Sequence, residues 1–216
     1  NRRTPCKKAR SMTIHHTYQP IADTSTPDPH QDVYSKTVLG FWIYLMTDCL
    51  VFATLFCTYA VLHNSTFGGP SSRDIFTLSI PFFETMVLLF SSVTCGFAVL
   101  ASLKNNTKGV LFWLAITFLL GATFVGTELN EFHHLVQEGN DWTNSAFLSS
   151  FFALVSTHGL HVSFGLLWIL VMIGQVFFLG INTDTFRRLV VFSLFWHFLD
   201  LVWIFIFTFV YLMGVI

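Results

Sequence analysis

The sequence predicts an all-α protein, an integral membrane bundle of five transmembrane helices. Of its 216 residues, 53% are hydrophobic and only 11% are charged, whereas a soluble domain carries about a quarter charged residues. The chain also holds five long apolar runs. A helix of about 20 residues crosses the roughly 30 Å hydrocarbon core of a bilayer, and each run reaches that length. The runs cover about residues 38–62, 80–103, 110–130, 147–179 and 189–214.

The residues before the first run predict a polar tail. Residues 1–36 are rich in Pro, Thr, Asp and His, a composition typical of disordered segments. We therefore expect a tail over residues 1–36 and a single transmembrane domain over residues 37–216. Met12 is the first methionine, and translation that starts there would exclude the basic residues before it. These residues are therefore not used to predict the orientation.

The connections between the runs predict the orientation of the bundle. The first connection carries the turn residues Phe67-Gly68-Gly69-Pro70, and only Arg73 is basic there. The other basic residues flank the opposite side. By the positive-inside rule, the N-terminus is expected in the cytoplasm and the C-terminus outside. The basic residues on the predicted cytoplasmic side are Lys36, Lys104, Lys108, Arg187 and Arg188.

Small residues in the runs predict where helices pack closely. Membrane helices approach one another at Gly and other small residues, because there is little hydrophobic driving force between helices in lipid. Gly121 with Gly126, and Gly159 with Gly165, are therefore expected to mark two contact faces.

The runs also contain ionisable residues that hydrocarbon should exclude. Each costs a few kcal/mol or more unless it faces the bundle interior and finds a partner. Counting about 1.5 Å per residue, five of them lie near the bilayer midplane and three glutamates lie nearer the external surface. The predicted polar cluster consists of Asp48, Glu84, Glu128, Glu131, His158, His161, His197 and Asp200.

Two histidine-containing pairs are spaced so that each lies on one helix face. His158 with His161, and His197 with Asp200, are separated by three residues, and we expect them to pair between the fourth and fifth helices. The residues alone leave two interpretations open. One is a metal, haem or proton-handling site. The other is an internal hydrogen-bond network that fixes helix register.

Other features narrow the classes of function. A membrane di-iron enzyme would need more deep histidines than the chain offers, although bis-histidine haem ligation between the last two helices stays open. No paired-cysteine metal motif or disulfide framework is visible among the four cysteines. The net charge of −1 argues against nucleic acid as a partner.

Four ordered blocks of the chain resemble subunit III of the haem-copper oxidases. Thr157-His158-Gly159-Leu160-His161-Val162 and Trp196-His197-Phe198-Leu199-Asp200-Leu201-Val202-Trp203 resemble two signature blocks of that family. The segment from Phe41 to Asp48 resembles the family's first signature helix, and the segment from Gly121 to Phe132 resembles a further block. The resemblance covers about residues 37 to 214.

Within the family, the sequence is most similar to the branch that belongs to cytochrome bo-type ubiquinol oxidases. Leu88-Leu89-Phe90-Ser91-Ser92, Glu131-Phe132-His133-His134-Leu135 and Tyr211-Leu212-Met213-Gly214 carry this likeness. Many cytochrome c oxidase members have seven helices, and this chain lacks the first two. A short-form cytochrome c oxidase subunit III is the alternative within the family. An independent membrane haem or metal protein is the alternative outside it.

The resemblance implies a supporting role in a proton-pumping, oxygen-reducing complex of the bacterial inner membrane. It implies no catalytic, cofactor-binding or metal-binding residue in this chain, with haem and copper held by the catalytic subunit. The implied partners are oxidase subunits I and II, a small subunit IV, and phospholipids. Asp48 matches a family carboxylate that reacts with hydrophobic carbodiimides, which implies a protonated acid accessible from lipid. No Lys or Arg lies within the five runs to pair with it.

Overall fold

A computed structural model describes residues 29–62, 79–137 and 145–212, with side chains from Lys36 onward. Within these ranges every long element is a helix, and five are long and apolar enough to cross a membrane. This confirms the predicted fold class. The helices are α1 (Pro29–Leu62), α3 (Ser79–Leu103), α4 (Thr107–Gln137), α5 (Ala146–Leu179) and α6 (Thr183–Ile206), and α6 continues as the π-helical segment η1 (Phe207–Leu212).

Three helices extend beyond their apolar runs. α1 begins at Pro29, so the predicted tail boundary at residue 36 falls inside a helix. Proline suits a first helical turn, where its missing N–H needs no partner. α4 continues to Gln137 and α6 begins at Thr183. An apolar run measures the depth of the hydrocarbon, whereas polar residues can continue a helix into water. Residues 1–28 and the turn at Phe67 to Pro70 lie outside the described residues.

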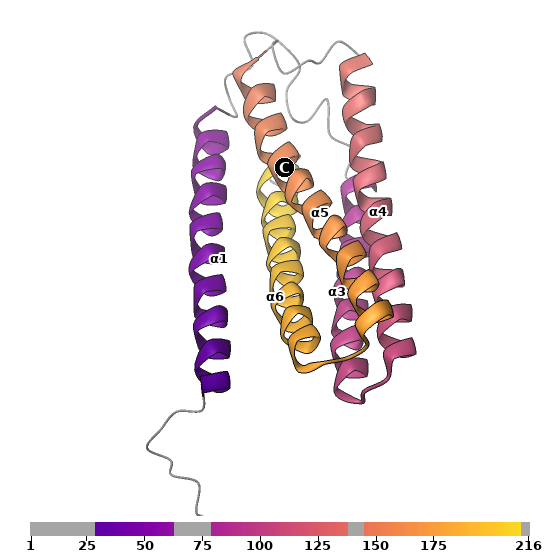
Figure 1. Cartoon of the computed structure of the whole chain (residues 1–216). Helices are drawn as coiled ribbons and strands as arrows, with labels where there is room; N and C mark the ends of the chain where they lie inside the picture. The colour runs from indigo at the N-terminus through magenta and orange to yellow at the C-terminus, as the bar shows by residue number, and fades with distance from the viewer. Residues whose placement is uncertain (1–28, 63–78, 138–144, 213–216) are drawn as a thin grey trace, which may run out of the picture.

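α1 stands at one edge of the bundle (Figure 1). It packs against α5 and α6, while α3 packs most extensively on α4. α5 ends at Gly180, whose φ of 70° suits a residue without a side chain. The connection from α3 to α4 turns through Asn105, with a φ of 54°, and the Asn106 side chain accepts a hydrogen bond from the Gly109 N–H at 3.2 Å. The connection from α5 to α6 lies at the same end of the bundle as the connection from α3 to α4 (Figure 1).

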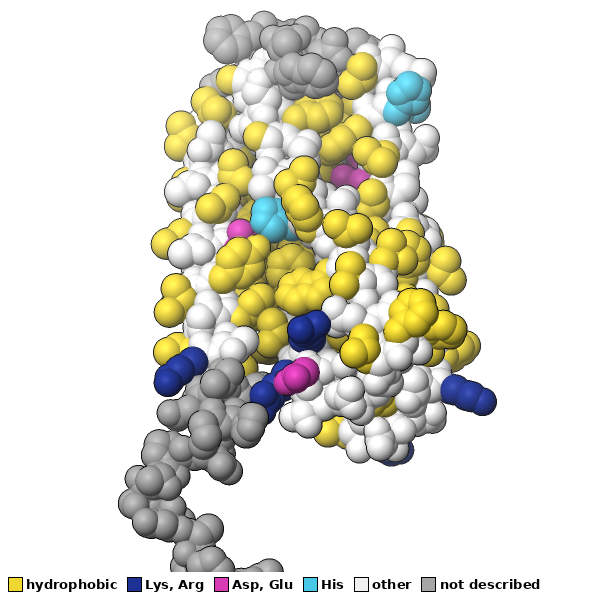
Figure 2. Space-filling model, viewed as in Figure 1, with side chains coloured by type: hydrophobic (Ala, Val, Ile, Leu, Met, Phe, Trp, Pro, Cys, Tyr) yellow, Lys and Arg dark blue, Asp and Glu magenta, His cyan; other side chains and the backbone are white. Residues whose placement is uncertain are grey.

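Charged and apolar residues divide the surface as a bilayer requires. Large hydrophobic side chains such as Phe178 and Val61 are 83% and 78% exposed, which is the expected state of a side chain that faces lipid. Figure 2 shows apolar side chains, in yellow, over the middle of this face of the bundle and Lys and Arg side chains, in dark blue, toward one end. That asymmetry is the one on which the predicted orientation rests.

Two indoles on α6 fix its position against α3. Trp196 donates a hydrogen bond from Nε1 to Ser91 Oγ at 2.9 Å, and Trp203 donates one to Thr85 Oγ1 at 3.1 Å. Both tryptophans are about 1% exposed. A buried indole N–H needs such a partner, so these hydroxyls set the register of the two helices.

Two glycines let α4 and α5 approach the Trp196 ring. A Cβ at Gly165 would lie 2.7 Å from Trp196 Cζ3, and one at Gly121 would lie 2.8 Å from a Leu166 methyl and 3.0 Å from the indole. The predicted close contact is confirmed at one glycine of each pair, Gly121 and Gly165. The prediction was wrong for Gly126 and Gly159, because a Cβ at either position would contact no other described helix of this chain. Five or six residues turn a helix by about 140° or 240°, onto another face.

Replacing Gly165 with Ala should destabilise the protein by about 1–3 kcal/mol, because the new methyl overlaps an indole that its hydrogen bond holds in place. Gly159→Ala is the matched control on the same helix and should cost nothing measurable. The measurement is the thermal unfolding midpoint in detergent. Equal midpoints for the two variants would show that Trp196 moves freely aside.

Candidate functional site

The eight predicted polar residues form separate groups rather than one cluster. Asp48 on α1 meets His161 on α5. Three carboxylates from α3 and α4 converge elsewhere. The remaining polar residues lie apart from both groups, and they are His158, His197 and Asp200.

The contact between Asp48 and His161 ties α1 to α5. His161 Nε2 lies 3.2 Å from Asp48 Oδ1, and His161 Nδ1 lies 2.7 Å from the Thr157 carbonyl oxygen. A carbonyl only accepts, so Nδ1 carries a proton and donates it to Thr157. The contact to Asp48 then needs one further proton, held either by Nε2 or by the carboxyl group. In both cases the pair is neutral overall, which suits its 8% exposed carboxyl and half-buried imidazole.

This pairing differs from the predicted one. The expected partners of His161 were on α6, yet the described partner is on α1. Depth along the bilayer places all of these residues at one level, but the rotation of each helix decides which of them meet. The ring of His161 also packs 5.3 Å from that of Phe52, which is one turn along α1 from Asp48.

His158 lies in an aromatic cage instead of a polar network. It is fully buried, and neither ring nitrogen has a hydrogen-bond partner. Its ring stacks on Trp203 at 5.2 Å and contacts the edges of Phe124 at 5.8 Å and Phe52 at 6.3 Å. The imidazole therefore serves as a flat packing group between α1, α4 and α6.

His197 and Asp200 of α6 were predicted to pair with histidines of α5, but they form no such pair. His197 is exposed and donates from Nδ1 to the Ser193 carbonyl at 2.7 Å, within its own helix. Asp200 is 6% exposed, and neither of its oxygens has a hydrogen-bond partner. Three residues along a helix leave two side chains about 60° apart around its axis. His197 lies at the exposed edge of this helix face, whereas Asp200 lies at its buried edge.

The described residues offer little for a redox cofactor. Within residues 29–62, 79–137 and 145–212, the one group of three or more potential metal ligands that converge contains glutamates and no histidine. The deep histidines are engaged by a carboxyl group, an aromatic cage or a backbone carbonyl. Bis-histidine haem ligation between α5 and α6 would need His197 to face a histidine of α5, whereas His197 is exposed and bonded to its own helix.

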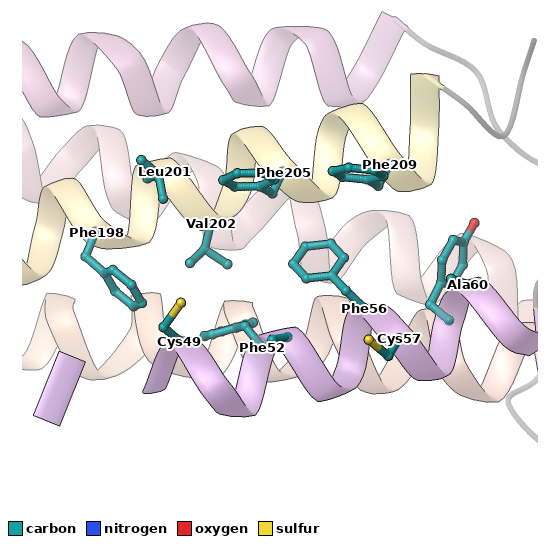
Figure 3. A pocket seen from close by; sticks show the side chains of 12 residues that line it. Cys49, Phe52, Phe56, Cys57, Ala60, Phe198, Leu201, Val202, Phe205 and Phe209 are labelled. Carbon is teal, nitrogen blue, oxygen red and sulfur yellow. The ribbon is translucent and has the colours of Figure 1, made fainter. Parts of the chain in front are cut away.

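An apolar groove of about 600 Å³ runs between α1 and α6 (Figure 3). Phe52 and Phe56 line it from α1, Phe205 lines it from α6, and Phe209 lines it from η1. Asp48 and His161 are not among its lining residues. Hydrocarbon chains can pack against the side chains that line the groove. None of the described residues that line it carries a charge that could bind a polar ligand.

Sequence reasoning missed the hydroxyls that hold the two tryptophans. Ser91 and Thr85 lie six residues apart on α3, and their partners Trp196 and Trp203 lie seven apart on α6. The signal was present, because a buried indole demands an acceptor and these hydroxyls interrupt an apolar run.

Comparisons with known proteins place the whole arrangement in a family. The family model for cytochrome c oxidase subunit III matches residues 12–215. The cytochrome bo(3) ubiquinol oxidase subunit 3 of Pseudomonas aeruginosa is 55% identical over 187 residues, which is 87% of this chain and 90% of the relative. The protein of the same name from Pseudomonas putida is 56% identical over 185 residues, which is 86% and 89% of the two chains.

A relative from the cytochrome c branch is less similar. The cytochrome c oxidase subunit 3 of Bacillus sp. strain PS3 is 47% identical over 178 residues, which is 82% of this chain and 86% of the relative. The match to the family model covers nearly the whole chain, and each of these relatives aligns with more than four fifths of it. The chain belongs to the cytochrome c oxidase subunit III family, the third subunits of the haem-copper oxidases.

Proposed function

We propose that this chain is the non-catalytic subunit III of a bacterial terminal oxidase that takes electrons from ubiquinol and reduces oxygen to water. The carrying observation is the higher identity to ubiquinol oxidase subunits, 55% and 56%, than to a cytochrome c oxidase subunit, 47%. The five spans and the bacterial relatives make it a multi-pass protein of the bacterial cytoplasmic membrane.

Its proposed role is to stabilise the catalytic subunit and to support proton uptake, with no haem or copper of its own. The side-chain geometry supports this role, because the buried ionisable residues tie helices together. Asp48 with His161 joins α1 to α5. In this proposal, the haem and copper centres belong to the catalytic subunit I.

The proposed partners are subunits I and II, a small subunit IV and membrane phospholipids. The exposed apolar surface over the middle of the bundle (Figure 2) supports contacts with lipid and with other membrane helices. The proposed orientation has the N-terminus in the cytoplasm. It is supported by the described Lys and Arg residues, which lie at the end where α1 begins.

A purification through a tag on this chain tests the proposal. From native membranes in mild detergent, the chain should bring down a complex that contains haem and copper and oxidises ubiquinol. Oxidation of reduced cytochrome c in its place would favour the alternative, a short-form cytochrome c oxidase, whose subunit II carries copper ligands. Recovery of a lone haem-containing chain would contradict both.

The variant His158→Leu should leave the haem content and the assembly of that complex unchanged. It loses ring stacking worth about 0.5–1.5 kcal/mol and also removes buried ring nitrogens without a partner, whose burial costs about 1–3 kcal/mol. The two effects offset each other. The measurement is the ratio of haem to protein in the purified complex. A loss of one haem per complex would identify His158 as a ligand.

A further inference from the structure

Three glutamates from two neighbouring helices direct their carboxyl groups at one another. Glu128 and Glu131 lie on α4, and Glu84 lies on α3. One oxygen of each carboxyl group lies within 4.8 Å of the corresponding oxygen of the other two. The site is far from Lys104 and Lys108, which lie at the opposite ends of the same helices. It is also separate from the pair of Asp48 and His161.

Glu84 is the unusual member of the group. Its side chain is 0% exposed, it reaches across from the other helix, and neither of its oxygens has a hydrogen-bond partner. One oxygen each of Glu128 and Glu131 also lacks a partner. Buried carboxyl groups are costly without partners, and native proteins leave very few. Those that remain point to an ion or a water molecule.

The convergence of one oxygen from each carboxyl group suits a cation. Carboxyl groups that share a proton place their oxygens about 2.5–3.0 Å apart. The oxygens without partners form no hydrogen bond that satisfies both the distance and the angle of one. A calcium-sized cation takes oxygens at about 2.3–2.6 Å, so any two of its ligand oxygens lie no more than about 5 Å apart. The three oxygens satisfy this bound, because all of them lie within 4.8 Å of one another.

We propose that Glu84, Glu128 and Glu131 form a structural site for a redox-inactive divalent cation of the calcium or manganese class. Carboxylate oxygens are the ligands these hard cations prefer. The charges also balance, because two ionised carboxylates and one protonated carboxyl neutralise a divalent ion. The bound cation joins α3 to α4.

Titration of the intact oxidase complex with Mn²⁺ tests this site. The complex, purified through a tag on this chain and stripped with a chelator, is titrated while electron paramagnetic resonance measures free Mn²⁺. The parent complex should bind one more Mn²⁺ than the Glu84→Gln complex, and Ca²⁺ should displace it. Asp184→Asn is the control, because this exposed acid pairs with Arg187 on α6 and should leave the count unchanged.

A second variant covers a failure of Glu84→Gln to assemble. Glu131 is half-buried, so Glu131→Gln should disturb packing least while weakening Mn²⁺ binding by about tenfold or more. The proposal is overturned if the parent and Glu131→Gln complexes bind the same number of Mn²⁺ ions with the same affinity. Carboxylic acid bands in the infrared spectrum that are assigned to these residues and unaffected by Mn²⁺ would also overturn it, in favour of shared protons. Neither outcome depends on which electron donor the complex uses.

Discussion

Trp196→Ala should destabilise the bundle by about 3 kcal/mol, near the lower end of the range for deleting a buried tryptophan. Trp196 is 1% exposed, and its ring fills the space between Gly121 and Gly165. In lipid the loss is one of packing contacts rather than of hydrophobic transfer, which lowers the cost. The variant also leaves Ser91 Oγ without its indole partner. The measurement is the denaturant or temperature at which the subunit leaves the purified complex.

Trp42→Ala is the matched control for that experiment. Trp42 is 50% exposed on the outer part of α1, so its removal should change the release of the subunit by far less. Trp196→Phe should fall between the two, since it keeps most of the ring volume but loses the hydrogen bond to Ser91. If Trp196→Ala and Trp42→Ala behaved alike, the indole would not organise the helices around it.

Asp48→Lys should prevent stable incorporation of the subunit. A lysine at this depth costs about 2.5–3.5 kcal/mol or more, and it would face His161 Nε2, which then loses its carboxyl partner. Because α1 stands at the edge of the bundle and packs on α5 and α6, we expect α1 to separate first. The amount of subunit III in the affinity-purified complex, measured by quantitative mass spectrometry, reports the effect.

Asp48→Asn keeps the contact and serves as the control. The amide can donate a hydrogen bond to the unprotonated Nε2 of His161, whose Nδ1 proton is directed to Thr157, and the pair stays neutral. Assembly should therefore approach that of the parent. If Asp48→Asn were lost from the complex as fully as Asp48→Lys, the pair would require an ionised carboxylate facing a protonated imidazole, and the form with the proton on the carboxyl group would be excluded.

The sequence was sufficient to predict the spans because composition alone decides which segments can enter hydrocarbon. It was also sufficient to place Asp48 and His161 at one depth, since depth follows from the rise of a helix. It could not predict that these two meet, because helix rotation depends on how side chains of different helices interlock. The same reason explains why Gly121 and Gly165 proved to be contact positions while Gly126 and Gly159 face open space.

The three glutamates illustrate the same limit from the other direction. Their depth was predictable, but the convergence of Glu84 with Glu128 and Glu131 arises from the close packing of α3 on α4. The ends of the helices could not be predicted from hydropathy, for a different reason. The apolar run ends where lipid ends, and hydropathy carries no signal for the helical turns that continue from there, such as those before Lys36.

The central claim is that this chain supports an oxidase without carrying a redox centre. The direct measurement is an absorption spectrum with haem and copper analysis of the chain purified alone in detergent. The account predicts no Soret band and no stoichiometric haem or copper, because the described deep histidines are held by a carboxyl group, an aromatic cage and a backbone carbonyl. One haem bound per chain, and lost on replacing His158 or His161, would contradict it.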